Sequence, residues 1–92
     1  MFIAIEGADG TGKTTQVERL CRWLEERGHR VVRCRDPGGT ALGESVREIL
    51  LHRESIPLNP RAESLLYMAS RAQLVAEVIQ PAIEAGHVVI SD

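Results

Sequence analysis

The sequence contains GADGTGKT at residues 7–14, which fits the pattern G-x-x-x-x-G-K-[ST] at every required position. The preceding residues 2–5 form a short apolar run that predicts a buried strand, and a helical pattern follows the loop. A strand, a glycine-rich loop and a helix in this order are typical of the phosphate-binding loop of α/β proteins. The stretch therefore predicts a parallel sheet with flanking helices, built around a nucleoside triphosphate site.

The residue types of this loop suit the binding of several phosphate groups. Glycines at 7 and 12 let backbone N–H groups approach an anion closely. Lys13 is expected to reach the β- and γ-phosphates in a catalytic role, and the Thr14 hydroxyl to bind Mg²⁺. The full set of expected nucleotide-binding residues is Gly7, Ala8, Asp9, Gly10, Thr11, Gly12, Lys13, Thr14 and Thr15. The alternative, a glycine-rich turn that matches by accident, is disfavoured by the flanking strand and helix.

Composition excludes several other classes of site. The net charge is −2 and the basic residues are dispersed, which argues against a nucleic-acid surface. Two cysteines far apart and three scattered histidines do not make a zinc site. Glu6 directly follows the short apolar run at the amino terminus, so we expect neither a secretory signal nor a membrane span there. A cytoplasmic location is the default expectation.

Apolar spacing divides the rest of the chain into three helices and two more strands. The first helix is expected at about residues 13–27, and its buried face comprises Val17, Leu20, Cys21 and Leu24. Gly28 ends it, and residues 31–34 form a second strand. Residues 35–40, with Pro37, Gly38 and Gly39, predict a loop at the carboxyl end of this strand, where ligands bind in open α/β sheets.

The next two helices carry more than one apolar stripe. Thr40 caps a helix whose buried stripe is expected to be Leu42, Val46, Ile49 and Leu50, with Arg47 beside it. Asn59 and Pro60 begin a third helix, which continues to about Ala85 with a kink or break near Pro81. One face of this helix is Leu65, Met68, Ala69, Ala72, Val75, Ala76 and Ile79, and another is Tyr67, Arg71, Leu74 and Val78. We therefore expect it to be enclosed on two sides or to lie beside a cavity.

A third strand is predicted at residues 88–90, after Gly86, and Asp92 closely follows it. Strand, helix, strand, two helices and strand predict a parallel sheet. If the first and third strands are neighbours, Asp92 lies at the same sheet edge as the phosphate-binding loop. A carboxylate there can hold Mg²⁺ or its waters, which makes Asp92 a candidate catalytic residue and metal ligand. An ordinary surface aspartate is the alternative.

Four further motifs resemble the thymidylate kinase family, and with the loop they cover essentially the whole chain. RDPGGT at 35–40 resembles that family's R-E-P-G-G-T loop, and GESVR at 43–47 its G-E-x-[IV]-R helix. LLYMASRAQ at 65–73 resembles L-L-[FY]-x-A-x-R-x-Q, and ISD at 90–92 resembles the start of the D-R-[YF] element. The first motif alone indicates any phosphate-loop protein, whereas this set in this order is specific.

The resemblance implies an enzyme that transfers the γ-phosphoryl group of ATP to dTMP, with Mg²⁺ as cofactor. It implies that Tyr67 stacks on thymine and that Arg71 donates to the carbonyl edge of the base. It also assigns the acceptor phosphate to Arg47 and the sugar 3′-hydroxyl to Asp9. Asp36 is a further substrate-binding candidate, although the family usually has Glu there, and the role of Arg35 stays open. The expected partners are dTMP and ATP, with a possible homodimer of the full-length protein.

The same resemblance predicts that these residues are incomplete. We expect a single phosphate-loop kinase domain over residues 1–92, of the P-loop nucleoside triphosphate hydrolase type and truncated at its carboxyl end. Gly10 stands where some family members have an arginine, and the others supply that charge from a later lid. Without it, the 92 residues alone are expected to be at best a weak nucleotide binder, with the first strand exposed at the sheet edge.

Three other readings remain open from the sequence. One is another nucleotide or nucleoside kinase with the same loop, which would differ in its acceptor. The second is a phosphate-loop switch or ATPase, against which the Tyr67 and Arg71 pair argues. The third is a non-catalytic ATP-binding fragment, which the sequence does not separate from a kinase.

Overall fold

The computed structural model describes residues 1–6 and 12–92 of the chain. These residues form two compact units, one made of Met1–Cys34 with Ile79–Asp92 and the other of Arg35–Val78. We refer to them as the sheet unit and the helical unit and describe each by itself.

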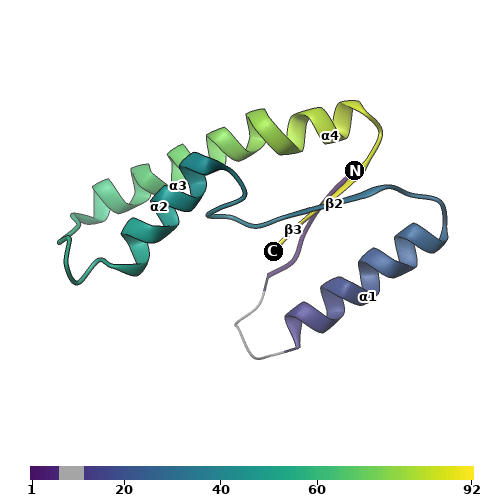
Figure 1. Cartoon of the computed structure of the whole chain (residues 1–92), viewed down its shortest axis with the longest axis horizontal. Coiled ribbons are helices and arrows are strands. Elements are labelled where there is room, and N and C mark those ends of the chain that lie inside the picture. The colour runs from purple at the N-terminus through teal and green to yellow at the C-terminus, as the bar shows by residue number, and fades with distance from the viewer. Residues whose placement is uncertain (7–11) are drawn as a thin grey trace. The chain divides into compact units, whose positions relative to one another are not determined.

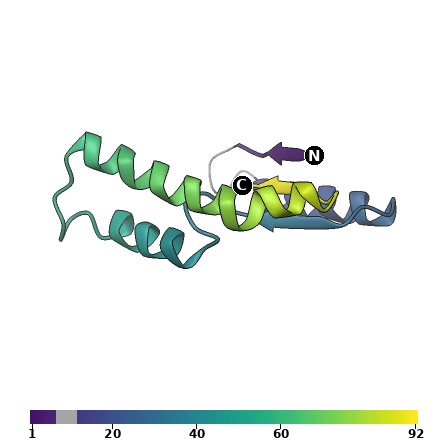
Figure 2. The ribbon, with the colours of Figure 1, turned by 90° about the horizontal axis from the view of Figure 1, so that it is seen from above.

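The sheet unit contains three parallel strands, as the sequence predicts. They are β1 (Phe2–Ala4), β2 (Val31–Cys34) and β3 (Val88–Ser91), in the order β1-β3-β2. Figure 2 shows the three arrows pointing the same way. Phe2 is 46% exposed because β1 pairs on one side only. The expectation of a buried first strand is therefore wrong for Phe2, and that of a first strand exposed at the sheet edge is confirmed.

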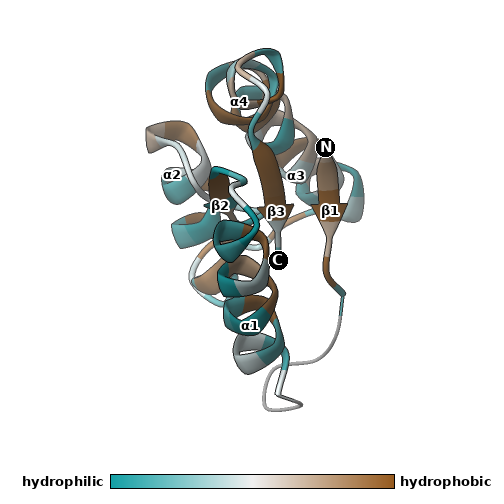
Figure 3. Ribbon diagram, turned by 90° about the vertical axis from the view of Figure 1, so that its right-hand side faces the viewer, coloured by the Kyte–Doolittle hydropathy of each residue, from teal (hydrophilic) through white to brown (hydrophobic). Residues whose placement is uncertain are grey.

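Helices cover the sheet on both sides. Helix α1 (Lys13–Glu26) packs Val17 and Leu24 against Val88 and Ile90 of β3, and the predicted face residues Leu20 and Cys21 join this core. The short helix α4 (Gln80–Glu84) contacts β3 and lies on the side of the sheet opposite α1 (Figures 1 and 3). Continuous burial of β3 is what a central parallel strand requires.

The helical unit pairs α2 (Ala41–Leu51) with α3 (Pro60–Leu74). Both predicted caps are present: the Thr40 hydroxyl accepts from the Gly43 N–H at 2.9 Å, and the Asn59 side chain accepts from the Arg61 N–H at 2.9 Å. Val46 and Leu50 of the predicted stripe are buried, but Leu42 is 44% exposed. Gly43 takes its place on the buried face, where the backbone approaches closely.

The third helical run is less enclosed than the sequence predicts. Its buried residues in α3 are Ser70 and Leu74, whereas Leu65 and Met68 are 66% and 67% exposed. The expectation of cover on two sides is therefore wrong for the face of Leu65, Met68 and Val75. The alternative, a cavity beside the helix, fits its amino-terminal end, where Pro60, Arg61, Ser64 and Leu65 line an open hollow of about 450 Å³. The spacing shows which faces are apolar, but it does not show which of them is covered.

The predicted irregularity near Pro81 is present as a change of helix type. A π-helical segment, Val75–Ile79, separates α3 from α4, and Pro81 lies in the first turn of α4. Pro81 has no N–H to donate to the preceding turn, so a regular α-helix cannot continue through it. Among the described residues, no helix is both long and apolar enough to span a bilayer.

Candidate functional site

The carboxyl edge of the sheet brings Asp92 beside the end of β1. Ala4 is in register with Ser91, and the Ile5 N–H donates to the Ser91 carbonyl at 2.8 Å. Because β1 and β3 are parallel neighbours, Glu6 and Asp92 leave the sheet at the same edge. The condition that the sequence set for Asp92 is thus met. Residues 7–11, which include Asp9 and Gly10, lie outside the described part, and their roles stay predictions.

Lys13 and Thr14 occupy the first turn of α1, next to this loop in the chain. The Gln16 N–H donates to the Gly12 carbonyl at 3.0 Å, which closes that turn. Lys13 is half-buried, whereas Thr14 and Thr15 are exposed. Within residues 1–6 and 12–92, no carboxylate forms an ion pair with Lys13, so its charge is not neutralised by that part of the chain.

The chemistry of Thr14 and Asp92 suits Mg²⁺, because a hydroxyl and a carboxylate both offer the oxygen ligands that it prefers. No group of three or more His, Cys, Asp or Glu side chains in the described residues could hold a metal alone. Mg²⁺ keeps several waters and binds substrate phosphates, so few protein ligands are needed. The residues present therefore fit the ion.

Arg33 is a neighbour of Asp92 that the sequence reasoning missed. Its Nη2 lies 3.6 Å from Oδ2 of Asp92, and the two side chains are 39% and 19% exposed. The Asp92 N–H also donates to the Cys34 carbonyl at 3.1 Å. Arg33 is the one charged residue in the otherwise apolar strand 31–34, which could have indicated an ion pair. Its partner could not be identified before the strand order was known.

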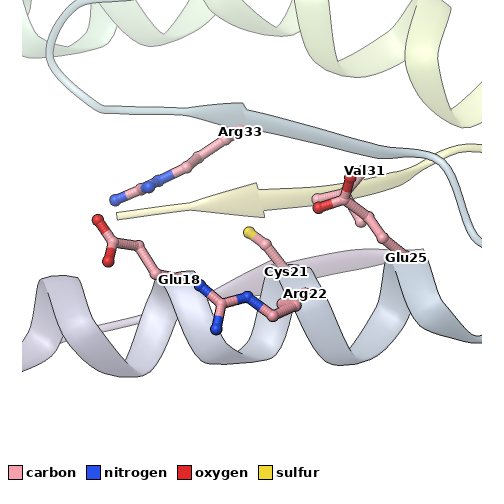
Figure 4. Close-up of a pocket in the computed structure, with 6 residues that line it drawn as sticks. All are labelled: Glu18, Cys21, Arg22, Glu25, Val31 and Arg33. Atoms are coloured by element: carbon pink, nitrogen blue, oxygen red, sulfur yellow. The ribbon is translucent and has the colours of Figure 1, made fainter.

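A hollow of about 370 Å³ lies between α1 and β2 in the sheet unit, lined by Glu18, Cys21, Arg22, Glu25, Val31 and Arg33. Figure 4 shows Arg33 reaching toward the same end of the hollow as Glu18. Of the described residues predicted to bind nucleotide or substrate, none is among those that line it. Arg33 thus connects this hollow with Asp92.

In the helical unit, residues 35–40 are held by side chains of both helices. Both oxygens of the Glu44 carboxylate accept from Nη2 of Arg35 at 3.1 Å, and Oε1 also accepts from the Gly39 N–H at 3.1 Å. The fully buried Ser70 hydroxyl of α3 accepts from the Gly38 N–H at 3.3 Å. Arg35, whose role the sequence left open, is therefore an anchor of the loop to α2.

Gly43 lets the first turn of α2 approach this loop, because a Cβ there would lie 2.6 Å from the Gly38 carbonyl oxygen. Helix propensity alone favours Gly43→Ala by about 1 kcal/mol, but overpacking against backbone costs about 1–3 kcal/mol. We expect a net loss of about 1 kcal/mol, measured by thermal unfolding of the full-length protein. Ser45→Ala, at an exposed position of the same helix, is the control. A higher midpoint for Gly43→Ala would contradict the close approach.

The Glu44 anchor predicts a loss of stability in acid. The Gly39 N–H, then the Arg35 hydrogen bond, lower the pKa of Glu44 from its ordinary value of 4.5. A carboxylate with a lowered pKa stabilises the fold above its unfolded pKa and loses that contribution as pH falls through the folded value. At neutral pH the wild type should therefore unfold at a higher temperature than Glu44→Gln. The difference between the two unfolding midpoints should disappear below pH 4.5. A gap independent of pH would refute this; Glu54→Gln is the control.

The predicted substrate residues of the helical unit lie on this loop, on α2 and on α3. Nε of Arg71 donates to Oδ2 of Asp36 at 2.6 Å, across 35 positions of sequence. Tyr67, one turn before Arg71 on α3, is 38% exposed. Nη1 of the half-buried Arg47 donates to the Pro37 carbonyl at 3.5 Å. The structure thus places Asp36 with Arg71 and Arg47 with the loop, and their contacts with substrate stay predictions.

Comparison with known proteins gives the same family that the motifs resemble. The family profile described as thymidylate kinase matches residues 5–92. The chain is 56% identical over 95 residues to thymidylate kinase of Bifidobacterium longum strain DJO10A, covering 100% of this chain and 46% of the relative. It is 54% identical over 92 residues to that of Clavibacter sepedonicus, covering 100% and 43%.

A solved structure has a similar fold, and this chain again covers only part of its length. The crystal structure of thymidylate kinase from Ehrlichia chaffeensis matches with a TM-score of 0.84 at 40% identity, over 100% of this chain and 52% of that one. The chain thus spans about half the length of the relatives that it matches. The profile match and these identities over the whole chain show that it belongs to the thymidylate kinase family.

Proposed function

We propose that the full-length protein transfers the γ-phosphoryl group of ATP to dTMP and forms dTDP. The observation that carries the proposal is the family match over residues 5–92. The residues expected to recognise dTMP also occur at exposed or half-buried positions: Tyr67 and Arg71 on one helix and Arg47 beside the loop 35–40. Such positions leave their side chains accessible to a ligand.

Transfer of the phosphoryl group requires that the two substrates be positioned and that the negative charge of the phosphates be compensated, and it forms no covalent intermediate with the protein. Lys13 would interact with the β- and γ-phosphates, and Gly7, Ala8, Asp9, Gly10, Thr11, Gly12, Thr14 and Thr15 would complete the nucleotide site. Mg²⁺, held through Thr14 and Asp92, would offset negative charge on the phosphate oxygens. The acceptor is already an ionised phosphate, so no residue need act as general base.

The acceptor residues would fix dTMP for in-line transfer. Arg47 has a planar guanidinium that can bind two phosphate oxygens at once. Tyr67 and Arg71 are four residues apart on α3, so a ring and a donor project from the same side of the helix. Asp9 would accept a hydrogen bond from the 3′-hydroxyl.

The proposal includes a homodimer and a cytoplasmic location. The exposed apolar face of Leu65, Met68 and Val75 on the third helical run supports association of two copies, because contiguous apolar side chains favour burial. Sedimentation of the full-length protein and of Met68→Glu tests the dimer: the variant should be monomeric, and an unchanged mass would exclude this face.

The test of function measures ADP formation by the full-length protein with Mg-ATP and, separately, dTMP, dUMP, AMP, CMP or no acceptor. Selective turnover with dTMP is the expected result. Equal ADP formation without acceptor would favour an ATPase, and preference for AMP or CMP would indicate a different nucleotide kinase.

A further inference from the structure

The Asp36–Arg71 pair combines a sheltered anion with an exposed cation. The Asp36 side chain is 16% exposed and that of Arg71 is 72% exposed, and Nε of Arg71 is the atom that contacts the carboxylate. The guanidinium has four further N–H donors on its two terminal nitrogens. No partner of those nitrogens is found in the described residues. The pair therefore fixes one edge of the guanidinium and leaves the other available.

The loop holds Asp36 in place from both sides. Arg35, directly before it, is bound by both oxygens of Glu44. Gly38, two residues after it, donates to the buried Ser70, which is the immediate neighbour of Arg71 on α3. Because these contacts join the loop to both helices, the Asp36 carboxylate has little freedom to follow Arg71 if that side chain moves. Asp36 is thus suited to orient Arg71.

An oriented guanidinium distinguishes pyrimidine bases by one substituent. Arginine offers only donors, so it matches a 4-oxo group, whereas a 4-amino group is itself a donor. A site whose donor must pair with a base oxygen rejects the analogue that leaves this donor unpaired. The strength of that rejection depends on whether the guanidinium can turn away at low cost.

We propose that Asp36 is a positioning residue that holds Arg71 for a 4-oxo pyrimidine and so strengthens the preference for dTMP over dCMP. This inference rests on the function proposed above. It changes the expected role of Asp36 from a substrate contact to a residue that acts through Arg71, because its carboxylate is already hydrogen-bonded and largely sheltered.

The contact itself can be tested without turnover by NMR of the full-length protein labelled with ¹⁵N-arginine. The Arg71 Nε–H signal, assigned by its absence in Arg71→Lys, should exchange slowly with solvent in the wild type. In Asp36→Asn, which keeps the shape but loses the charge, exchange should be faster. Glu63→Gln breaks the Arg53 pair elsewhere in the helical unit and should leave the signal unchanged. Equally fast exchange in the wild type and Asp36→Asn would overturn the inference.

Kinetics then test whether Asp36 acts through Arg71. In Asp36→Ala we expect KM for dTMP to rise about tenfold and the ratio of kcat/KM for dTMP over dCMP to fall similarly, with kcat largely kept. Asp36→Glu should restore most of both values. In an Arg71→Ala background, Asp36→Ala should have no further effect, because the group that it orients is gone.

The outcomes separate this inference from the proposed function. A wild type that phosphorylates dTMP, with Asp36→Ala changing neither KM nor selectivity, would overturn the inference and leave the function standing. The same conclusion would follow if the effects of Asp36→Ala and Arg71→Ala on KM and selectivity were additive, since Asp36 would then act independently of Arg71. A wild type that does not phosphorylate dTMP would overturn both. If the alanine variant unfolds, Asp36→Asn replaces it; its amide oxygen still accepts from Arg71, but more weakly, so KM and selectivity should shift in the same direction by a smaller factor.

Discussion

Replacing Lys13 with methionine is expected to lower kcat of the full-length protein about 1,000-fold. The ammonium group is expected at the β- and γ-phosphates, where negative charge spreads during transfer, and methionine keeps much of the bulk but none of the charge. The half-buried Lys13 side chain lies in the first turn of α1 and has no ion-pair partner in residues 1–6 and 12–92. Its positive charge therefore stabilises no ion pair in that part of the chain. The measurement is single-turnover phosphorylation of dTMP at saturating Mg-ATP.

Arg19→Met is the matched control, because Arg19 is an exposed cation on the same helix. It should keep kcat within about twofold, as surface substitutions away from a site usually do. Thermal unfolding of both variants would separate a catalytic loss from a folding defect. A Lys13→Met protein that keeps its unfolding midpoint and retains kcat within tenfold of wild type would contradict the role given to Lys13.

Local patterns in the sequence predicted the elements of the fold well. Spacing of apolar residues located α1 and all three strands, and the caps Thr40 and Asn59 began their helices as expected. These features depend on neighbours within a few residues, so the sequence contains the information directly. The same is true of Pro81, whose missing N–H imposes an irregular turn whatever packs around it.

Packing between elements could not be predicted in the same way. Periodicity identified two apolar faces on the third helix, but Leu65 and Met68 show that a face can be apolar and exposed. Likewise, the Arg33–Asp92 and Asp36–Arg71 pairs join residues that are far apart in sequence. Such pairs depend on strand order and on where a loop meets a helix, which spacing does not encode.

The second large effect is expected at Arg47, the residue assigned to the acceptor phosphate. Arg47→Met should lower kcat/KM for dTMP about 100-fold in the full-length protein. Arg47 is half-buried beside the loop, and its Nη1 donates to the Pro37 carbonyl at 3.5 Å, a long hydrogen bond that a phosphate could replace. Because the acceptor carries its charge before transfer begins, most of the loss should be a rise in KM rather than a fall in kcat. The KM for ATP should be unchanged.

Arg53→Met distinguishes this role from a general loss of positive charge. Arg53 lies in the same helical unit, but its guanidinium already pairs with Glu63 at 3.0 Å. An exposed pair of this kind contributes about 0–1 kcal/mol, so its loss should leave both kinetic constants nearly unchanged. If Arg47→Met and Arg53→Met raise KM for dTMP equally, the effect comes from net charge and Arg47 does not bind the acceptor phosphate. A rise confined to Arg47→Met requires a local contact, because the two variants change the charge of the protein by the same amount.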